Sequence, residues 1–305
     1  AELAQRAGMP AGVLNIITAD GPNSIAVGKV LCASDIVRHL SFTGSTEVGR
    51  ILAAQCAPTI KKLSLELGGN APFIVFDDAD LDSAVEGAMI SKYRNAGQTC
   101  VCANRLYVQD GVYEEFARRL VKASSALRVG DGLAGPTEQG PLIDANALAK
   151  VEEHIADALA KGAKIASGGK RHALGGTFFE PTILTGVTGD MKVAREETFG
   201  PVVAVQRVKD EDEAIRMAND SPYGLSGSVW TKDIDKAHLF AKKVKAGTVW
   251  VNTYRVVSPI AEFGGYKFSG YGRESGFQAM YDYTRPKTVW INTSTAPIAN
   301  PFVMR

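Results

Sequence analysis

Two residues, Cys100 and Glu66, could form a nucleophile and its base. Cys100 ends the small turn Gly97-Gln98-Thr99-Cys100, and Glu66 ends an apolar, alternating run just before two glycines. A thiol is a strong nucleophile only as its thiolate, so a carboxylate that takes its proton makes the pair chemically useful. Taken alone, each residue has a plainer interpretation, because lone cysteines are usually small buried hydrophobic residues and a glutamate before two glycines usually lies in a solvated turn.

Three glycine-containing segments accompany this pair. Residues 42–49 read Phe-Thr-Gly-Ser-Thr-Glu-Val-Gly, residues 196–202 read Glu-Glu-Thr-Phe-Gly-Pro-Val, and residues 263–270 read Phe-Gly-Gly-Tyr-Lys-Phe-Ser-Gly. In the first, Ser45 or Thr46 can cap a helix whose N-terminus offers unpaired N–H groups and a positive dipole end to an anion. The segment is neither a GxGxxG fingerprint nor a Walker A loop, so an ordinary capped helix is the alternative.

In their order and approximate spacing these segments resemble the motifs of the aldehyde dehydrogenase superfamily, and the resemblance covers essentially the whole chain. It implies oxidation of a small aldehyde to a carboxylic acid with NAD or NADP. Cys100 would attack the carbonyl to give a thiohemiacetal, hydride would pass to the nicotinamide, and Glu66 would activate water to hydrolyse the thioester. Hydrolytic release is implied because acylating members typically lack a glutamate at this position.

The same resemblance implies how the cofactor is held. The segment from Gly44 to Gly49 would face the pyrophosphate, with Ser45 as its side-chain contact. Glu197 would hydrogen-bond the nicotinamide ribose, and Phe199 would pack near the nicotinamide ring.

It also implies where the substrate binds. Residues 252–259 and Phe263 resemble the loop that lines the family's substrate tunnel. Within that loop, Arg255 would pair with a carboxylate on a semialdehyde or form a salt bridge at the tunnel mouth.

Composition excludes several other classes. The chain has 305 residues, 45% of them hydrophobic, and a formal net charge of +1, which fits about two globular domains and gives no support for a nucleic-acid or membrane-surface role. Four scattered cysteines predict neither a disulfide scaffold nor a metal site, and no apolar stretch approaches a membrane span. We therefore expect a cytoplasmic protein without a metal, nucleic-acid or membrane partner.

Alternating strand-like and helix-like segments predict βαβ units and an α/β fold. The fold expected from the resemblance is aldehyde dehydrogenase-like, with a partial Rossmann-type nucleotide-binding domain (1–67), a second α/β catalytic domain (68–270), and a C-terminal helix and oligomerisation strand (271–305). The expected strands are 13–17, 36–42, 60–66, 71–75, 105–108, 164–167, 178–184, 202–208, 226–230 and 248–251, and the expected helices are 23–32, one ending near 57, 81–92, 112–127, 142–160, 191–196, 211–218 and 235–244.

The two ends of the chain carry expectations of their own. Residues 285–292 alternate as a strand whose edge needs a partner. In the resembled family this strand pairs with a neighbouring subunit, which implies a homodimer or homotetramer. At the other end the chain begins as if inside a helix, and it lacks the family's Pro-Trp-Asn and Lys-Pro-Ala-Glu segments. We therefore expect the C-terminal part of such an enzyme.

Two other classes of function stay open on the sequence. A catalytically dead, truncated relative would act as a binding or structural subunit, and it would bind NAD without turnover or not at all. A thioesterase or amidase would use Cys100 and Glu66 without nicotinamide and would hydrolyse esters independently of any cofactor. That second class leaves the motifs at 44–49 and 197–199 without an explanation.

Overall fold

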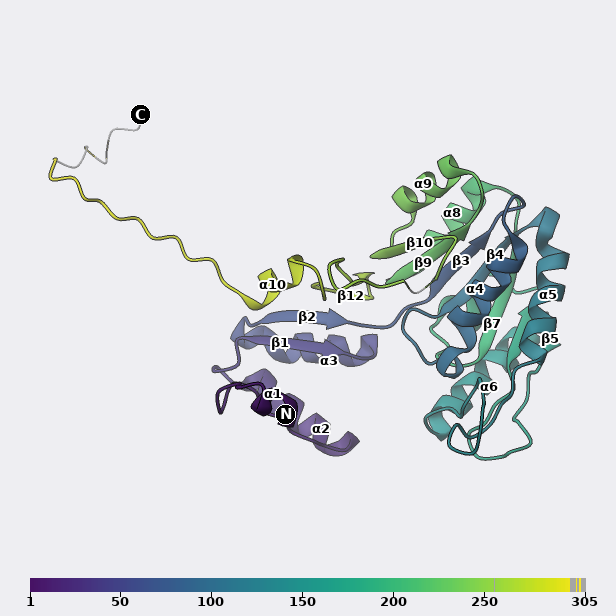
Figure 1. The fold of residues 1–305 in the computed structure, drawn as a ribbon, viewed down its shortest axis with the longest axis horizontal. Coiled ribbons are helices and arrows are strands. Elements are labelled where there is room, and N and C mark those ends of the chain that lie inside the picture. The colour runs from purple at the N-terminus through teal and green to yellow at the C-terminus, as the bar shows by residue number, and fades with distance from the viewer. Residues whose placement is uncertain (255, 297–299, 301, 303–305) are drawn as a thin grey trace.

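The computed structural model describes residues 1–254, 256–296, 300 and 302 (Figure 1). Its strands form three sheets, with strand orders β1-β2-β12, β10-β9-β3-β4-β7-β6-β5 and β11-β8. Most neighbouring strands in the two larger sheets are parallel, which confirms the predicted α/β class.

The smaller of these two sheets belongs mainly to the N-terminal part of the chain. Its first two strands are parallel, and a short strand from the C-terminal part adds antiparallel to β2. Two helices pack on it around a small core that contains Cys32, Leu40 and Cys56. These elements are β1 (His39–Thr43), β2 (Lys62–Glu66), β12 (Gly270–Tyr271), α2 (Gly21–Ala33) and α3 (Thr46–Cys56).

The seven-stranded sheet is parallel except for β5, which pairs antiparallel with β6 at one edge. The central strands β3 and β7 are nearly continuous apolar runs because both faces of the sheet are covered there. The strands are β3 (Ala71–Val75), β4 (Ala103–Gln109), β5 (Lys164–Ser167), β6 (Thr182–Thr185), β7 (Val202–Val208), β9 (Ser226–Trp230) and β10 (Thr248–Val251).

Helices cover both faces of this sheet, as Figure 1 shows. Alternate residues of β7 enter different cores: Val203 and Val205 pack with α4 and α5, whereas Val202 and Ala204 pack with α6 and α7. A third core, under α8 and α9, continues along the second face. The helices are α4 (Leu81–Tyr93), α5 (Tyr113–Ser125), α6 (Ala145–Ala160), α7 (Lys192–Arg195), α8 (Glu211–Asn219) and α9 (Ile234–Lys243).

The chain crosses between the two sheets at two adjoining places. It leaves β2 through Gly68 and Gly69 and returns at Ser269, just before β12. The buried Ser269 hydroxyl donates to the Gly68 carbonyl oxygen (2.7 Å) and accepts from the Gly224 N–H (3.0 Å). The remaining elements are α1 (Glu2–Arg6), β8 (Tyr223–Gly224), β11 (Tyr266–Lys267) and α10 (Gln278–Tyr283).

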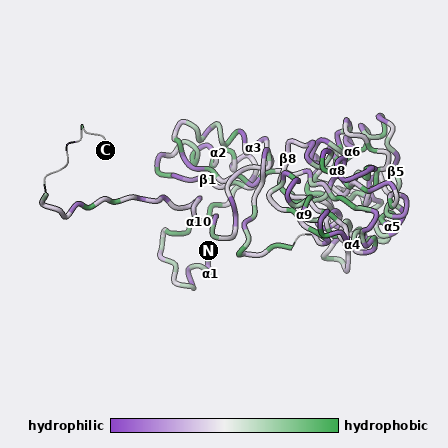
Figure 2. The backbone as a smooth tube through the Cα atoms, turned by 90° about the horizontal axis from the view of Figure 1, so that it is seen from above, coloured by the Kyte–Doolittle hydropathy of each residue, from purple (hydrophilic) through white to green (hydrophobic). Residues whose placement is uncertain are grey.

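Two predicted strands are absent from the described chain. Residues 13–17 form no strand, and Val13 and Ile17 are 67% and 71% exposed. Residues 285–292 are also exposed and unpaired, and they extend away from the body of the chain (Figures 1 and 2). Both predictions were wrong for the isolated chain, because a strand pattern marks a face to bury and does not supply a partner. Pairing of 285–292 with a second subunit and the domain boundaries at 67 and 270 stay predictions.

Among the described residues, no helix has both the length and the apolar character required to cross a bilayer.

Candidate active site

A left-handed turn between α4 and β4 delivers Cys100. Asn95 and Ala96 both have φ of 54°, and Gly97 follows at 73°. A Cβ on Gly97 would lie 2.2 Å from the Gly200 carbonyl oxygen, so only glycine fits this position. The turn therefore places Cys100 at the amino end of β4, close to the segment that precedes β7.

One cavity of about 700 Å³ collects most of the predicted site residues. It lies between the two sheets, because its walls come from the ends of β1 and β2, the turn before β4, helix α6 and the segment before β7. Predicted residues that line it are Cys100, Glu66, Gly44, Ser45, Glu197 and Phe199.

Two other predicted residues, both described in the structure, do not line this cavity. Gly49 is buried on α3, where a Cβ would lie 2.6 Å from the Leu67 side chain, so its described contact is packing. Phe263 lines a different cavity, of about 290 Å³, and exchanges two backbone hydrogen bonds with Glu274 (2.8 and 2.7 Å). Arg255 lies outside the described residues.

Glu66 ends β2 with its side chain buried. Its Oε2 atom has no hydrogen-bond partner in the described chain. Burial, and then the charge of Glu274, raise the pKa of Glu66 to about 8, while Arg273 opposes the shift. A carboxyl with such a pKa can accept a proton near neutral pH and release it again, as general base catalysis requires.

Cys100 is held as a thiol at rest. Burial and then the negative charge of Glu197 raise the pKa of Cys100, whereas the backbone N–H groups of Cys100 and Val101 favour the thiolate. Formation of the nucleophile therefore needs a group that accepts the proton. The neighbouring Cys102 is buried, and its Sγ donates to the Lys92 carbonyl oxygen (3.6 Å), away from this role.

Glu197 reaches the cavity across two glycines. Its Oε1 accepts the Gly69 N–H (2.9 Å), and a Cβ on Gly68 would lie 2.5 Å from its Oε2. Burial raises the pKa of Glu197, and the Gly69 N–H, Lys150 and Lys92 oppose that rise. One carboxylate oxygen of Glu197, Oε1, is thus held by a hydrogen bond, while the side chain lines the cavity.

The sequence interpretation missed the cavity wall that α6 supplies. Asn146, Ala147 and Lys150 all line the cavity, and their spacing places them on one side of the helix. Gln98 also lines it and ties the Cys100 turn to the segment before α6, since its Oε1 accepts the Ile143 N–H (2.8 Å). The helical spacing could have identified Asn146 and Lys150, but not which side faces Cys100.

A second cavity, of about 710 Å³, lies between α2 and α3. Its walls are mostly apolar and include Ile25, Val48 and Ile51. Phe42 also lines it, and Thr43 and Gly44 line the Cys100 cavity, so the two spaces adjoin at the end of β1. Between them, the Ser45 hydroxyl caps α3 by accepting the Val48 N–H (3.3 Å).

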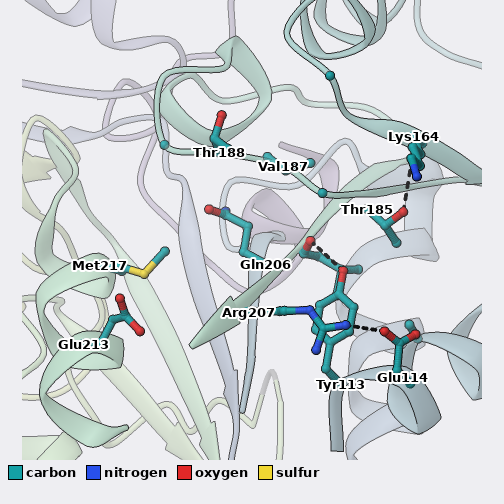
Figure 3. A pocket seen from close by; sticks show the side chains of 15 residues that line it. Tyr113, Glu114, Lys164, Thr185, Val187, Thr188, Gln206, Arg207, Glu213 and Met217 are labelled. Atoms are coloured by element: carbon teal, nitrogen blue, oxygen red, sulfur yellow. Dashed lines mark hydrogen bonds and ion pairs between the residues drawn. The ribbon is translucent and has the colours of Figure 1, made fainter. Parts of the chain in front are cut away.

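A third cavity, of about 610 Å³, lies near the carboxyl ends of β6 and β7, whereas the Cys100 cavity lies near the amino end of β7 (Figure 3). Arg207 pairs with Glu114 there and lies over the Tyr113 ring, with 3.8 Å from Cζ to the ring centroid. The described residues that line it include no cysteine, serine or histidine. Among the described residues, a cysteine beside carboxyl groups is therefore found in the Cys100 cavity and not in this one.

Comparison with known proteins agrees with this geometry. The model of the Aldehyde dehydrogenase family matches residues 1–289. The chain is 55% identical over 287 residues to 3-sulfolactaldehyde dehydrogenase of Pseudomonas putida, covering 94% of this chain and 58% of that protein. It is 56% identical over 291 residues to the NADP+-dependent succinate-semialdehyde dehydrogenase GabD of Escherichia coli, covering 95% and 60%.

Solved structures give the same result. A double mutant of betaine aldehyde dehydrogenase from Staphylococcus aureus, in complex with NAD+, has a TM-score of 0.93 and 40% identity, over 99% of this chain and 61% of that one. The chain thus spans about three fifths of the length of these relatives. Over that length its sequence and its fold agree with theirs, and the chain belongs to the aldehyde dehydrogenase family.

Proposed function

We propose that this chain carries the catalytic centre of an NAD(P)-dependent aldehyde dehydrogenase. The observation that carries the proposal is the single cavity in which Cys100, Glu66 and Glu197 meet the capped N-terminus of α3. A thiol nucleophile, a carboxyl with a pKa near 8 and a buried carboxylate fit acyl chemistry on a cysteine.

The residues present fit a dinucleotide. Ser45 and the unpaired N–H groups of α3 would hold its pyrophosphate, and the apolar cavity between α2 and α3 would take its adenine. A Cβ on Gly44 would lie 2.4 Å from the Phe42 ring, so glycine keeps the backbone close to this wall. Glu197 would accept from the ribose hydroxyls, and Phe199 would pack beside the ring. When bound, the cofactor supplies the hydride acceptor.

The remaining steps belong to the chain. Cys100 passes its thiol proton to Glu66, and Sγ, as thiolate, bonds to the aldehyde carbon to give a thiohemiacetal whose oxyanion the backbone N–H of Cys100 would stabilise. Glu66 releases this proton to solvent before the next step. Loss of hydride leaves a thioester on Sγ. Glu66 then takes a proton from water as the water adds to the thioester carbon, and the C–S bond breaks to release the acid and restore the thiol.

The relatives suggest the substrate class. Three relatives of this chain are named for the oxidation of 3-sulfolactaldehyde, glutarate semialdehyde and succinate semialdehyde. Each of these compounds is an aldehyde that carries an anionic group at its other end. We propose the same class for this chain, with Arg255 as the cation that pairs with the anionic group.

We also propose a cytoplasmic homodimer or homotetramer. Few, scattered cysteines support a reducing compartment. The exposed, alternating residues 285–292, with Trp290 at 89% exposure, support pairing with a second copy. Light scattering of the full chain and of a chain ending at Thr284 would test this, because only the full chain should form the larger species.

The activity is tested by mixing the chain with NAD or NADP and an aldehyde and measuring the absorbance of the NADH or NADPH formed. The aldehydes include some that carry an anionic group at the other end and some that do not. Turnover that is lost in Cys100→Ala and Glu66→Gln, and that is faster with the anionic aldehydes, supports the proposal. Ester hydrolysis that needs no cofactor would indicate a cysteine hydrolase instead. Folded protein with neither activity would contradict the proposal for this chain.

A further inference from the structure

One buried histidine holds both neighbours of Glu197. His154, on α6, is 1% exposed. Its Nδ1 shares a hydrogen bond of 3.1 Å with Thr198 Oγ1, and its Nε2 lies 3.5 Å from a carboxylate oxygen of Glu196. A single imidazole therefore contacts the residue before and the residue after Glu197.

These contacts fix the direction of Glu197. The side chains of Glu196 and Thr198 contact His154 on α6, whereas Glu197 accepts the Gly69 N–H at the crossing between the two sheets. The Glu196 backbone is extended, with φ of −110° and ψ of 152°, which is the geometry in which successive side chains alternate. Holding two neighbours on one side therefore keeps Glu197 on the other.

The next residue also needs support. Phe199 has φ of 54°, a left-handed conformation that a bulky residue rarely adopts. Such a conformation persists only where the surroundings impose it. The bond from His154 to Thr198 is made directly before this strained residue, so it restrains Phe199 as well.

We propose that His154 is a positioning residue that holds Glu197 and Phe199 in the Cys100 cavity. The role deepens the proposed function and rests on it only for what Glu197 and Phe199 do toward the cofactor. His154 itself does not line the cavity. His154 lies one helical turn beyond Lys150 on α6, and Lys150 does line the cavity. His154 therefore acts through residues 196 and 198 and not by direct contact with the cavity.

The surroundings of the ring select one protonation state. Nε2 faces a carboxylate oxygen of Glu196, so the tautomer that satisfies both contacts has its proton on Nε2 and accepts the Thr198 hydroxyl at Nδ1. Burial is the main cause that lowers the pKa of His154; Lys150 and Lys192 also lower it, whereas Glu196 and Glu153 oppose them. The neutral imidazole that this arrangement needs is therefore the form present at neutral pH.

Alkylation of Cys100 reports on the position of Glu197 without requiring turnover. Cys32, Cys56 and Cys102 are buried, so iodoacetamide should modify Cys100 first, and peptide mass identifies the site. Because the Glu197 charge raises the pKa of Cys100, Glu197→Gln should move the pH profile of alkylation to lower pH.

If His154 positions Glu197, His154→Phe and Thr198→Val should shift the profile in the same direction. His154→Asn should shift it less, because its amide keeps a partner for Thr198 near the Nδ1 position. His238→Phe, which changes an exposed histidine on α9, should leave it unchanged. An unchanged profile in His154→Phe overturns the proposal, and so does an unchanged profile in Glu197→Gln.

Cofactor binding supplies the second readout. Quenching of protein fluorescence by NADPH should show dissociation constants raised about tenfold in His154→Phe and Thr198→Val but not in His238→Phe. A wild-type chain that binds no dinucleotide would contradict the proposed function, while the alkylation profile would still decide whether His154 positions Glu197.

Discussion

Glu197 accepts the backbone N–H of Gly69, with 2.9 Å between Oε1 and the nitrogen. This bond joins the segment before β7 to the crossing between the two sheets, three residues after β2 ends at Glu66. The carboxylate attributed to cofactor binding and the carboxyl attributed to catalysis are therefore set by the same short stretch of backbone.

Substitution of Gly68 should disturb this relationship. In Gly68→Ala the new Cβ would lie 2.5 Å from Glu197 Oε2, so the carboxylate must move. We expect the dissociation constant for NAD(P) to rise at least about tenfold, which corresponds to about 1.4 kcal/mol. Fluorescence titration measures it. Gly140→Ala is the matched control, because no atom lies within 4 Å of its Cβ, and equal affinities for the two variants would contradict the prediction.

Glu66 should make stability depend on pH. Its pKa is about 8 in the folded chain and near the ordinary 4.5 when unfolded, so the folded state retains the proton over that range. The stabilisation is complete below pH 4.5 and is lost as the pH rises through about 8. The melting temperature of the wild type relative to that of Glu66→Gln should decrease as the pH is raised from 5 to 9. A constant difference would show that the Glu66 pKa is ordinary.

Cys100 and Cys102 are two residues apart, but only Cys100 should be required for activity. Cys100→Ala removes the nucleophile, and NAD(P)H formation should drop by more than about 10³-fold. Cys102 is buried and bonded to the Lys92 carbonyl oxygen, so Cys102→Ala should keep most of the rate and the iodoacetamide reaction. Loss of alkylation in Cys102→Ala would instead assign the reactive thiol to Cys102.

Ser45 offers a test that separates helix capping from anion binding. Ser45→Ala loses the bond to the Val48 N–H and should destabilise the chain by about 1 kcal/mol. Ser45→Asp retains a capping acceptor but places a negative charge where the pyrophosphate is expected. It should therefore keep the wild-type melting temperature and bind NAD(P) at least about tenfold more weakly. Unchanged affinity would remove Ser45 and the α3 terminus from the cofactor site.

The sequence allowed the local features of the site to be predicted. The Cys100 turn, the capped helix after Ser45 and the strand that ends at Glu66 all depend on neighbouring residues, and the structure contains each of them. Their convergence on one cavity could be expected only through the family resemblance. Local patterns do not specify which strand ends meet.

Features that depend on distant contacts were harder to predict. His154 lies in an ordinary amphipathic helix, and nothing in its neighbourhood indicates Thr198 or Glu196 as partners. The backbone pairing of Phe263 with Glu274 joins two segments 11 residues apart beside a separate cavity, and contact of Phe263 with the substrate stays a prediction. The strand-like pattern at 13–17 failed because strand formation needs a neighbouring edge that those five residues cannot provide.

The double crossing at Ser269 has a mechanical consequence. Two chain segments that are hydrogen-bonded to each other at Gly68 and Ser269 join the sheets, so the position of one sheet is tied to that of the other at two points of the chain. Glu197 and the carbonyl of Cys100 lie directly against Gly68 and Gly69. Any change in the angle between the two sheets would therefore move Glu197 relative to Cys100 across the candidate active site.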